Sequence, residues 1–309
     1  MNTQTDGAAS APVSQRRAAS PGIPDLPLPR RALEDLVAGA LAEDIAWGDL
    51  TTEALVPAGL SAEADVLVKS PGVLAGLPVL AATFAAVDPA TEVESLVADG
   101  ERVPAGEVVA RVRGQARSLL SAERVALNFI QRLSGIATAT ARYVEAVAGT
   151  RAVIVDTRKT TPGLRSLEKW AVRMGGGQNH RRNLSDGVLV KDNHLVAIAA
   201  SGRTLAEAIA DARRRWPHTI RVEVEVERLD QIPDALDAGA DIVLLDNMRP
   251  ALLRQAVELI AGRALTEASG GVTLDSVRAV AEAGVDLISV GALTHSSPSL
   301  DISLDLRIG

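Results

Sequence analysis

Short runs of apolar, largely β-branched residues recur along the second half of the chain. Six of them end in a polar residue or a Gly turn, at 153–155, 188–190, 222–226, 242–245, 264–268 and 287–290. Alanine-rich segments with helical spacing lie between the later runs, as at 250–262 and 274–283. Apolar strands that alternate with helices are typical of parallel β–α units. The pattern therefore predicts an α/β barrel, closed or nearly closed, with an open doubly wound sheet as the alternative.

The first half of the chain has a different pattern. A short helix is predicted from near Pro29, and the segments 64–69 and 108–113 alternate apolar with polar residues. Gly and Pro interrupt the stretch between these segments, as they do at the turns of a small antiparallel sheet. An apolar stripe from about 118 to 148 then predicts a long helix. We expect an α+β domain before the barrel.

These patterns divide the chain into three parts. Residues 1–29 are rich in Ala, Ser, Pro and Gly, and no apolar stretch follows Arg16-Arg17. We therefore expect a disordered leader and not a secretion signal. Residues 30–128 form the predicted α+β N-terminal domain, which the C-terminal segment 297–309 joins. Residues 129–296 form the predicted α/β barrel domain.

The composition narrows the class of protein. The 309 residues are 47% apolar, enough to fill a core, but they include only three Trp, two Phe and one Tyr. The scarcity of aromatic side chains and the net charge of −7 argue against a nucleic-acid partner. The absence of Cys excludes disulfides and thiolate metal sites. No apolar run reaches the roughly 18 residues of a membrane span, so we expect a soluble, cytoplasmic protein.

Residues 151–194 reverse this charge. They hold nine Lys or Arg and two His against four acidic residues, a local charge of +5. The glycine triplet 175–177 lies beside this charge, and a merely solvated face would not need it, so the triplet also indicates a ligand site. So many cations repel one another unless an anion binds. An Arg guanidinium binds a carboxylate through bidentate hydrogen bonds, and a Lys ammonium is a point charge that attracts phosphate. The segment predicts a site for a small, multiply anionic ligand, formed by Arg158, Lys159, Arg181 and Lys191 near strand ends.

Three acids alternate along the third predicted strand of the barrel, at Glu223, Glu225 and Glu227. They share one face of that strand. A solvated edge is the ordinary explanation of such a run, but this strand lies among buried ones, so the acids should point into the barrel or its mouth. With Asp246 on the next strand, Glu225 could bind sugar hydroxyls or a hydrated Mg²⁺. The neighbouring cations could equally be structural partners of these acids.

Small residues follow the last two predicted strands, at 269–271 and 289–294. They would let backbone N–H groups approach an oxyanion, and barrels often bind phosphate there. Tight turns explain the same glycines equally well. His180 follows the glycine triplet. A single His is more often structural, and the four His of the chain show no metal-ligand spacing, but His180 lies among the cations of the predicted anion site.

Short motifs are spread from about residue 30 to the C-terminus. They are Glu43-Asp44, Gly48-Asp49, Thr51-Thr52, and the segments 116–140, 156–165, 175–181, 184–194, 223–227, 244–247, 267–271 and 290–296. In this combination and order they resemble the motifs of the quinolinate phosphoribosyltransferase family (nicotinate-nucleotide pyrophosphorylase, carboxylating). The leader is the main addition to the family pattern.

The resemblance implies an α/β fold with an incomplete barrel, and homodimers whose subunits complete each other's sites. It implies transfer of phosphoribosyl from phosphoribosyl pyrophosphate to quinolinate with decarboxylation, which gives nicotinate mononucleotide, pyrophosphate and CO₂ for NAD synthesis. By motif, quinolinate would bind to Arg158, His180, Arg181, Lys191 and Arg124 of the partner subunit. The phosphoribosyl pyrophosphate would bind to Lys159, Glu225, Asp246, Ser269, Gly270, Gly271, Gly291 and His295. The catalytic residues would be Lys159, Glu225 and Asp246, with Glu225 and Asp246 also holding Mg²⁺, directly or through water.

Such a reaction needs no strong nucleophilic side chain. The pyridine nitrogen would attack the anomeric carbon as pyrophosphate leaves, and Glu225 or Asp246 could stabilise an oxocarbenium-like state. Three other functions stay open: a related pyrophosphorylase with another substrate, a barrel aldolase or isomerase with Lys159 or Lys191 as a Schiff base, and a non-catalytic anion-binding protein.

Overall fold

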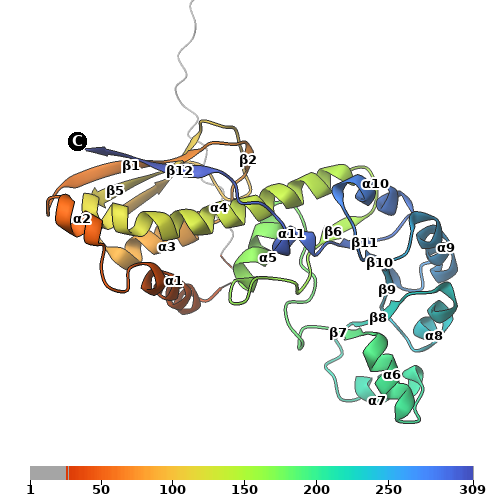
Figure 1. Ribbon diagram of the computed structural model, residues 1–309. Helices are drawn as coiled ribbons and strands as arrows, with labels where there is room; N and C mark the ends of the chain where they lie inside the picture. Colours follow the sequence, from red (N-terminus) through yellow and green to blue (C-terminus); the bar gives the residue numbers. More distant parts are fainter. Residues whose placement is uncertain (1–25, 27, 309) are drawn as a thin grey trace, which may run out of the picture.

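A computed structural model describes residue 26 and residues 28–308 of the chain (Figure 1). Most of the predicted leader, residues 1–29, lies outside the described residues. The helices of the described part include none long and apolar enough to span a membrane.

The N-terminal part is an antiparallel sheet covered by helices, as predicted. Its elements are α1 (Arg30–Asp44), α2 (Leu50–Leu55), β1 (Ser61–Val68), β2 (Gly72–Val73), α3 (Leu77–Val87), β3 (Glu92–Ser95), β4 (Arg102–Val103) and β5 (Val108–Gln115). The strand order of the main sheet is β12-β1-β5-β3, and β2 pairs separately with β4. The inward-facing residues of β1 and β5 are buried against α3, which explains the alternation seen in the sequence.

The last strand, β12 (Ile302–Ile308), returns to this N-terminal sheet. It pairs antiparallel with β1 from Val68↔Ile302 to Ala62↔Ile308. The end of the chain is thus part of the first sheet, although it follows the barrel in sequence.

A single long helix, α4 (Ala116–Ala146), connects the two halves (Figure 1). One part of its surface, including Ala126 and Ile130, packs into the core of the N-terminal sheet. Another, including Phe129, Leu133 and Ile136, packs into the barrel core. The predicted domain boundary between residues 128 and 129 falls inside this helix.

The second half is a parallel six-stranded barrel that is open on one side. Its elements are β6 (Val153–Val155), α5 (Arg165–Met174), β7 (Val188–Val190), α6 (Asp192–Ala200), α7 (Leu205–Arg213), β8 (Val222–Val226), the short 3₁₀ helix η1 (Leu229–Gln231), α8 (Ile232–Asp237), β9 (Ile242–Asp246), α9 (Pro250–Ile260), β10 (Leu265–Ser269), α10 (Leu274–Glu282), β11 (Leu287–Ser289) and α11 (Ala292–His295). The strand order is β6-β11-β10-β9-β8-β7. This cyclic order has no reversal point, so the doubly wound alternative is wrong.

The opening lies between the two end strands of the sheet. Among the described residues β6 and β7 do not pair. On its open side, β6 has only an isolated bridge, from Val155 to Gln178. The barrel is therefore incomplete. The carboxyl ends of all six strands face one rim, where barrels place their chemistry.

Candidate active site

A cavity of about 480 Å³ opens at the carboxyl ends of the barrel strands. Most predicted site residues line it: Arg158, Lys159, His180, Arg181, Lys191, Glu225, Asp246, Ser269, Gly270 and Gly271. Thr157, Leu189, Leu244, Asn247, Glu267 and Ser289 complete its wall. The structure thus brings together residues from five strands that are far apart in sequence.

A buried carboxylate fixes the loop that carries His180. Asp156, directly after β6, is fully buried and accepts hydrogen bonds from Lys169 Nζ, from Asn179 Nδ2 at 2.7 Å and from the His180 amide at 2.9 Å. Lys169 Nζ also donates to the His180 carbonyl at 3.0 Å. Burial raises the pKa of Asp156 and lowers that of Lys169, and the ion pair between them opposes both shifts. The ion pair of Asp156 with Lys169 thus holds His180 in place, although neither residue lines this cavity.

The cationic side chains are arranged to meet an anion. Arg158 Nε is buried and has no hydrogen-bond partner within the described part of the chain. Burial, with Arg158 nearby, lowers the pKa of the Arg181 guanidinium. Arg181 donates to the Gly187 carbonyl at 3.1 Å, which fixes its direction. Two guanidinium groups side by side with an unused buried donor are stabilised when a carboxylate or phosphate binds between them.

The carboxylates predicted for the ribose and Mg²⁺ lie in the same cavity. Glu225, half-buried on β8, forms an ion pair with Lys191. Asp246, at the end of β9, accepts a hydrogen bond from Asn247 Nδ2 at 2.6 Å. Glu225 therefore has Lys191 as its cationic partner, and not Arg158 or Lys159.

Two glycine turns form one end of the cavity. Gly270 has φ +92°, and a Cβ there would lie 2.1 Å from Asn247 Oδ1 and 2.9 Å from its backbone nitrogen. No side chain fits at this position. Gly291 lies outside the cavity lining, but a Cβ on it would come within 3.1 Å of Lys159 and 3.2 Å of His295. The small residues thus leave room for the neighbouring polar groups.

A buried ion pair supports the loop that carries Lys159. Glu168 is fully buried and accepts hydrogen bonds from Arg132, on α4, and from both the amide and the hydroxyl of Thr161. Arg132 also donates to the Thr294 and Ser297 carbonyls. The Thr294 hydroxyl in turn donates to the Lys159 carbonyl at 2.7 Å. The long helix thereby tethers both the Lys159 loop and the loop after β11.

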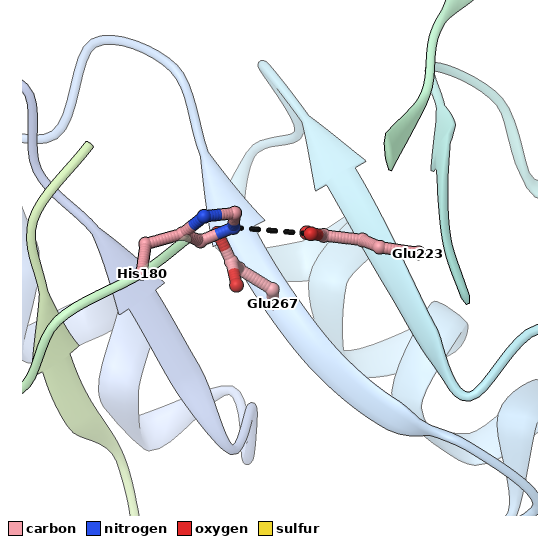
Figure 2. A group of neighbouring side chains, drawn as sticks. All are labelled: His180, Glu223 and Glu267. Atoms are coloured by element: carbon pink, nitrogen blue, oxygen red, sulfur yellow. Dashed lines mark ion pairs between the residues drawn. The ribbon is translucent and has the colours of Figure 1, made fainter. Parts of the chain in front are cut away.

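Below the cavity, three side chains converge (Figure 2). His180 Nε2 lies 3.0 Å from Glu223 Oε2 and 3.5 Å from Glu267 Oε1. Each residue has one nitrogen or oxygen atom that could bind a metal ion, and these three atoms lie within 4.8 Å of one another. The two glutamates, from β8 and β10, are almost completely buried. The Arg181 amide donates to His180 Nδ1 at 2.8 Å, so both ring nitrogens of His180 already have partners.

A second cavity of about 540 Å³ lies on the other side of this cluster. Its wall includes Val188, Ile242, Leu265 and Leu287, which begin their strands, and it shares His180, Arg181 and Glu267 with the first cavity. The cluster therefore separates a cavity at the carboxyl rim from one at the opposite end of the barrel.

The glycine triplet has a different cause from the one the sequence indicated. A Cβ on Gly175 would lie 2.4 Å from the Ala137 carbonyl oxygen, and one on Gly177 would lie 2.8 Å from Thr140. Both contacts are with α4. Close packing of the chain on this helix therefore requires these glycines, beside the charge but not because of it.

Three predicted residues, Arg124, Gly291 and His295, are not part of the cavity wall. Arg124 is exposed on α4, and His295 is exposed beyond Gly291. Two cavity acids, Glu223 and Glu267, were absent from the predicted site. A signal for both was present: Glu223 belongs to the alternating acid run, and Glu267 lies two residues before Ser269 on one strand face.

Comparison with known proteins agrees with this architecture. Residues 49–134 match the quinolinate phosphoribosyl transferase N-terminal domain, and residues 136–305 match the C-terminal domain. A probable nicotinate-nucleotide pyrophosphorylase [carboxylating] from Bacillus subtilis (strain 168) is 46% identical over 278 residues, which cover 89% of this chain and 94% of that protein. The nicotinate-nucleotide pyrophosphorylase [carboxylating] from Mycobacterium leprae (strain TN) is 42% identical over 281 residues, covering 89% and 97%.

Solved structures extend the agreement to three dimensions. The crystal structure of NadC from Streptococcus pyogenes has a TM-score of 0.85 at 44% identity, covering 91% of this chain and 99% of that one. The nicotinate-nucleotide pyrophosphorylase from Francisella tularensis has the same TM-score at 36% identity, covering 94% and 100%. The chain belongs to the quinolinate phosphoribosyltransferase family.

Proposed function

We propose that this enzyme transfers the phosphoribosyl group of phosphoribosyl pyrophosphate to quinolinate, with loss of CO₂, to form nicotinate mononucleotide. One observation carries the proposal: Lys191 and three cations with no ion-pair partner among the described residues, Arg158, Lys159 and Arg181, share a single cavity with the carboxylates of Glu225 and Asp246 and a glycine turn. The cations suit the carboxylates of a dicarboxylate, whereas the acids and the glycine turn suit the hydroxyls, Mg²⁺ and phosphate of a pyrophosphorylated sugar.

In this proposal the cations bind the pyridine dicarboxylate. Arg158 and Arg181 meet its carboxylates from one side, where the unused Arg158 Nε is a ready donor. Lys191 meets them from β7 while it holds Glu225. His180 lies at the floor of the same cavity. Cations fixed in advance position the substrate and lower the entropic cost of bringing two molecules together.

The phosphoribosyl group occupies the opposite end of the cavity. Backbone N–H groups around Ser269–Gly271 are open to a phosphate, since a Cβ on Gly271 would meet nothing within 4 Å. Lys159 lies toward the pyrophosphate. Glu225 and Asp246 offer oxygen ligands of the type that Mg²⁺ takes together with substrate phosphates. When bound there, Mg²⁺ would neutralise charge on the leaving pyrophosphate.

The residues of the chain then act mainly by position and charge. As the pyridine nitrogen attacks the anomeric carbon, Glu225 or Asp246 stabilises the positive charge that develops on the ribose. Lys159 stabilises the departing pyrophosphate. The new pyridinium is an electron sink for the bond to the adjacent carboxylate, which leaves as CO₂.

We also propose that the enzyme is a homodimer and works in the cytoplasm. Arg124 is exposed on α4 and does not line the cavity, and by the family resemblance Arg124 of the partner subunit would complete the site. Three large apolar side chains, Trp47, Leu50 and Leu55, are also exposed near α2, which packs on α4. The chain has no Cys, so no disulfide ties it to an oxidising compartment.

The test is product formation by the purified protein. With quinolinate, phosphoribosyl pyrophosphate and Mg²⁺, we expect pyrophosphate, CO₂ and nicotinate mononucleotide in equal amounts, and a large loss of rate with EDTA. Nicotinate in place of quinolinate should give no comparable turnover. Turnover of another acceptor and none of quinolinate would identify a related pyrophosphorylase and contradict the proposal. The ion pair of Lys191 with Glu225 occupies its amine, which argues against a Schiff base there.

A further inference from the structure

The proposed reaction leaves one requirement unassigned. When CO₂ departs, the bonding electron pair stays on the pyridinium carbon next to nitrogen, and that carbon must receive a proton. A donor must therefore lie at the cavity and hold a proton near neutral pH.

Glu267 has the first of these properties. It is 1% exposed, lines the substrate cavity and lies on the same face of β10 as Ser269. Two residues of a strand span about 7 Å, so Glu267 lies one layer below the proposed phosphate turn. Glu267 also lies 3.5 Å from His180, beside the cations proposed to hold quinolinate, so a pyridine ring bound to them would have its reacting carbon above Glu267.

The surroundings of Glu267 favour the neutral acid. Neither of its oxygens has a hydrogen-bond partner within the described part of the chain, and Glu223 Oε1 has none either. His180 can donate one proton, from Nε2, and Glu223 at 3.0 Å is the nearer acceptor. Two buried carboxylates with one shared donor cannot both be charged without a large cost.

The electrostatics agree with this geometry. Burial and the neighbouring Glu223 raise the pKa of Glu267 to about 7. Burial lowers the pKa of His180, but the hydrogen bond to Glu223 and the charges of both glutamates outweigh it and raise the pKa. The Arg181 amide, which donates to Nδ1, disfavours a second ring proton. The arrangement thus places one proton on Nε2 and a further one on Glu267.

We propose that Glu267 is the acid that protonates the ring carbon from which CO₂ departs. This inference rests on the proposed function. The bond from the ring carbon to its carboxylate breaks, CO₂ leaves, and the electron pair on that carbon takes the proton of the Glu267 carboxyl. Glu267 becomes a carboxylate, and His180 Nε2–H, 3.5 Å away, stabilises the new charge.

The second cavity gives the donor a route to be recharged. Glu267 and His180 line it as well as the substrate cavity, and its volume of about 540 Å³ has room for many water molecules. Its wall also includes the polar side chains Gln178, Asn179 and Arg221. A proton from this side reaches Glu267 while the product still occupies the rim.

The test separates the two halves of the reaction in Glu267→Gln. Gln has the same shape but cannot release a proton, so single-turnover pyrophosphate release should stay near wild type. Nicotinate mononucleotide formation should slow about 100-fold, the usual contribution of a general acid. Glu227→Gln is the matched control, because Glu227 is the exposed acid at the end of β8. It should behave as wild type in both measurements.

Three results would overturn the assignment: unchanged product formation in Glu267→Gln, an equal loss of pyrophosphate release and product formation in that variant, or a ratio of product formation to pyrophosphate release that stays constant as the pH rises. The last is measured on the wild type, so it holds even if the variant does not fold. As the pH rises above about 7, the rate of product formation should fall relative to pyrophosphate release. The groups that face Glu267 are Glu223, His180 and Ser289. Absence of pyrophosphate release in the wild type would instead refute the proposed function.

Discussion

Replacing Glu168 by Gln tests whether a buried carboxylate holds the Lys159 loop in place. Glu168 Oε1 accepts hydrogen bonds from Arg132 Nε at 3.2 Å, from Arg132 Nη2 at 2.9 Å and from the Thr161 hydroxyl at 2.8 Å. Its Oε2 accepts one from the Thr161 amide at 3.0 Å. The substitution keeps the shape of the side chain but removes its charge and one acceptor.

The expected cost follows from these four bonds. The Gln amide nitrogen would face either the Thr161 amide or the other donors, so at least one donor is left unpaired. Removing one partner of a buried ion pair costs about 3–5 kcal/mol. The Arg132 side chain is 25% exposed and keeps some hydration. We therefore expect the free energy of unfolding to fall by about 2–4 kcal/mol, because each charged hydrogen bond contributes about 1.5–3 kcal/mol.

The assay is urea unfolding together with steady-state kinetics. Displacement of the Lys159 loop should also lower kcat/KM by about tenfold, equivalent to about 1.4 kcal/mol. Glu145→Gln is the control, since Glu145 forms an exposed ion pair with Arg102 and should cost at most about 1 kcal/mol. If Glu168→Gln matched this control in stability and rate, the proposed support of the loop by α4 would be wrong.

Three further predictions concern the cavity itself. Arg158→Ala or Lys191→Ala should lower kcat/KM at least about 100-fold, because two charged hydrogen bonds at about 1.5–3 kcal/mol each are lost; near-wild-type rates would contradict the site. Gly270→Ala should raise KM for phosphoribosyl pyrophosphate about tenfold (about 1.4 kcal/mol), because its Cβ would lie 2.1 Å from Asn247 Oδ1 and the turn proposed to bind the phosphate must move to relieve the clash; an unchanged KM would exclude this turn. Mixing inactive Arg124→Ala and Lys191→Ala subunits should restore about a quarter of wild-type activity through heterodimers with one intact site; no rescue would argue against shared sites.

The repeating pattern of the second half predicted the barrel because its strands are buried. All six predicted strands exist, with ends that differ by at most one residue, as for β10 at Leu265–Ser269. Runs of Val, Ile and Leu buried on both faces are specific to parallel sheets covered by helices. The alternation in β1 and β5 likewise followed from one buried face. Local pattern was sufficient for these elements.

The opening of the barrel and the glycine triplet depend on contacts between distant segments. Whether β6 pairs with β7 is decided by the path of the chain through α5, which no local pattern encodes. Gly175 and Gly177 are required by α4, more than thirty residues earlier. The charge around them suggested a ligand as their cause, because sequence alone cannot show which helix lies behind a loop.

The sequence predicted most of the cations and rim acids that line the cavity, but not the two glutamates at its floor. Glu223 and Glu267 are one strand apart in the sheet, on either side of β9, yet more than forty residues apart in sequence. Only the barrel order brings them to His180 (Figure 2). A sequence motif identifies residues within one segment. Whether residues of different segments share a proton depends on the distance between them, which the sequence does not show.

A crystal structure with quinolinate bound would show directly whether the rim cavity is the substrate site. We expect the pyridine ring in this cavity, with its carboxylates on Arg158, Arg181 and Lys191 and its nitrogen toward Glu225 and Asp246. Arg124 of the partner subunit should contact the same carboxylates. Quinolinate bound elsewhere, or in this cavity with its nitrogen turned away from the two acids, would refute the proposed site.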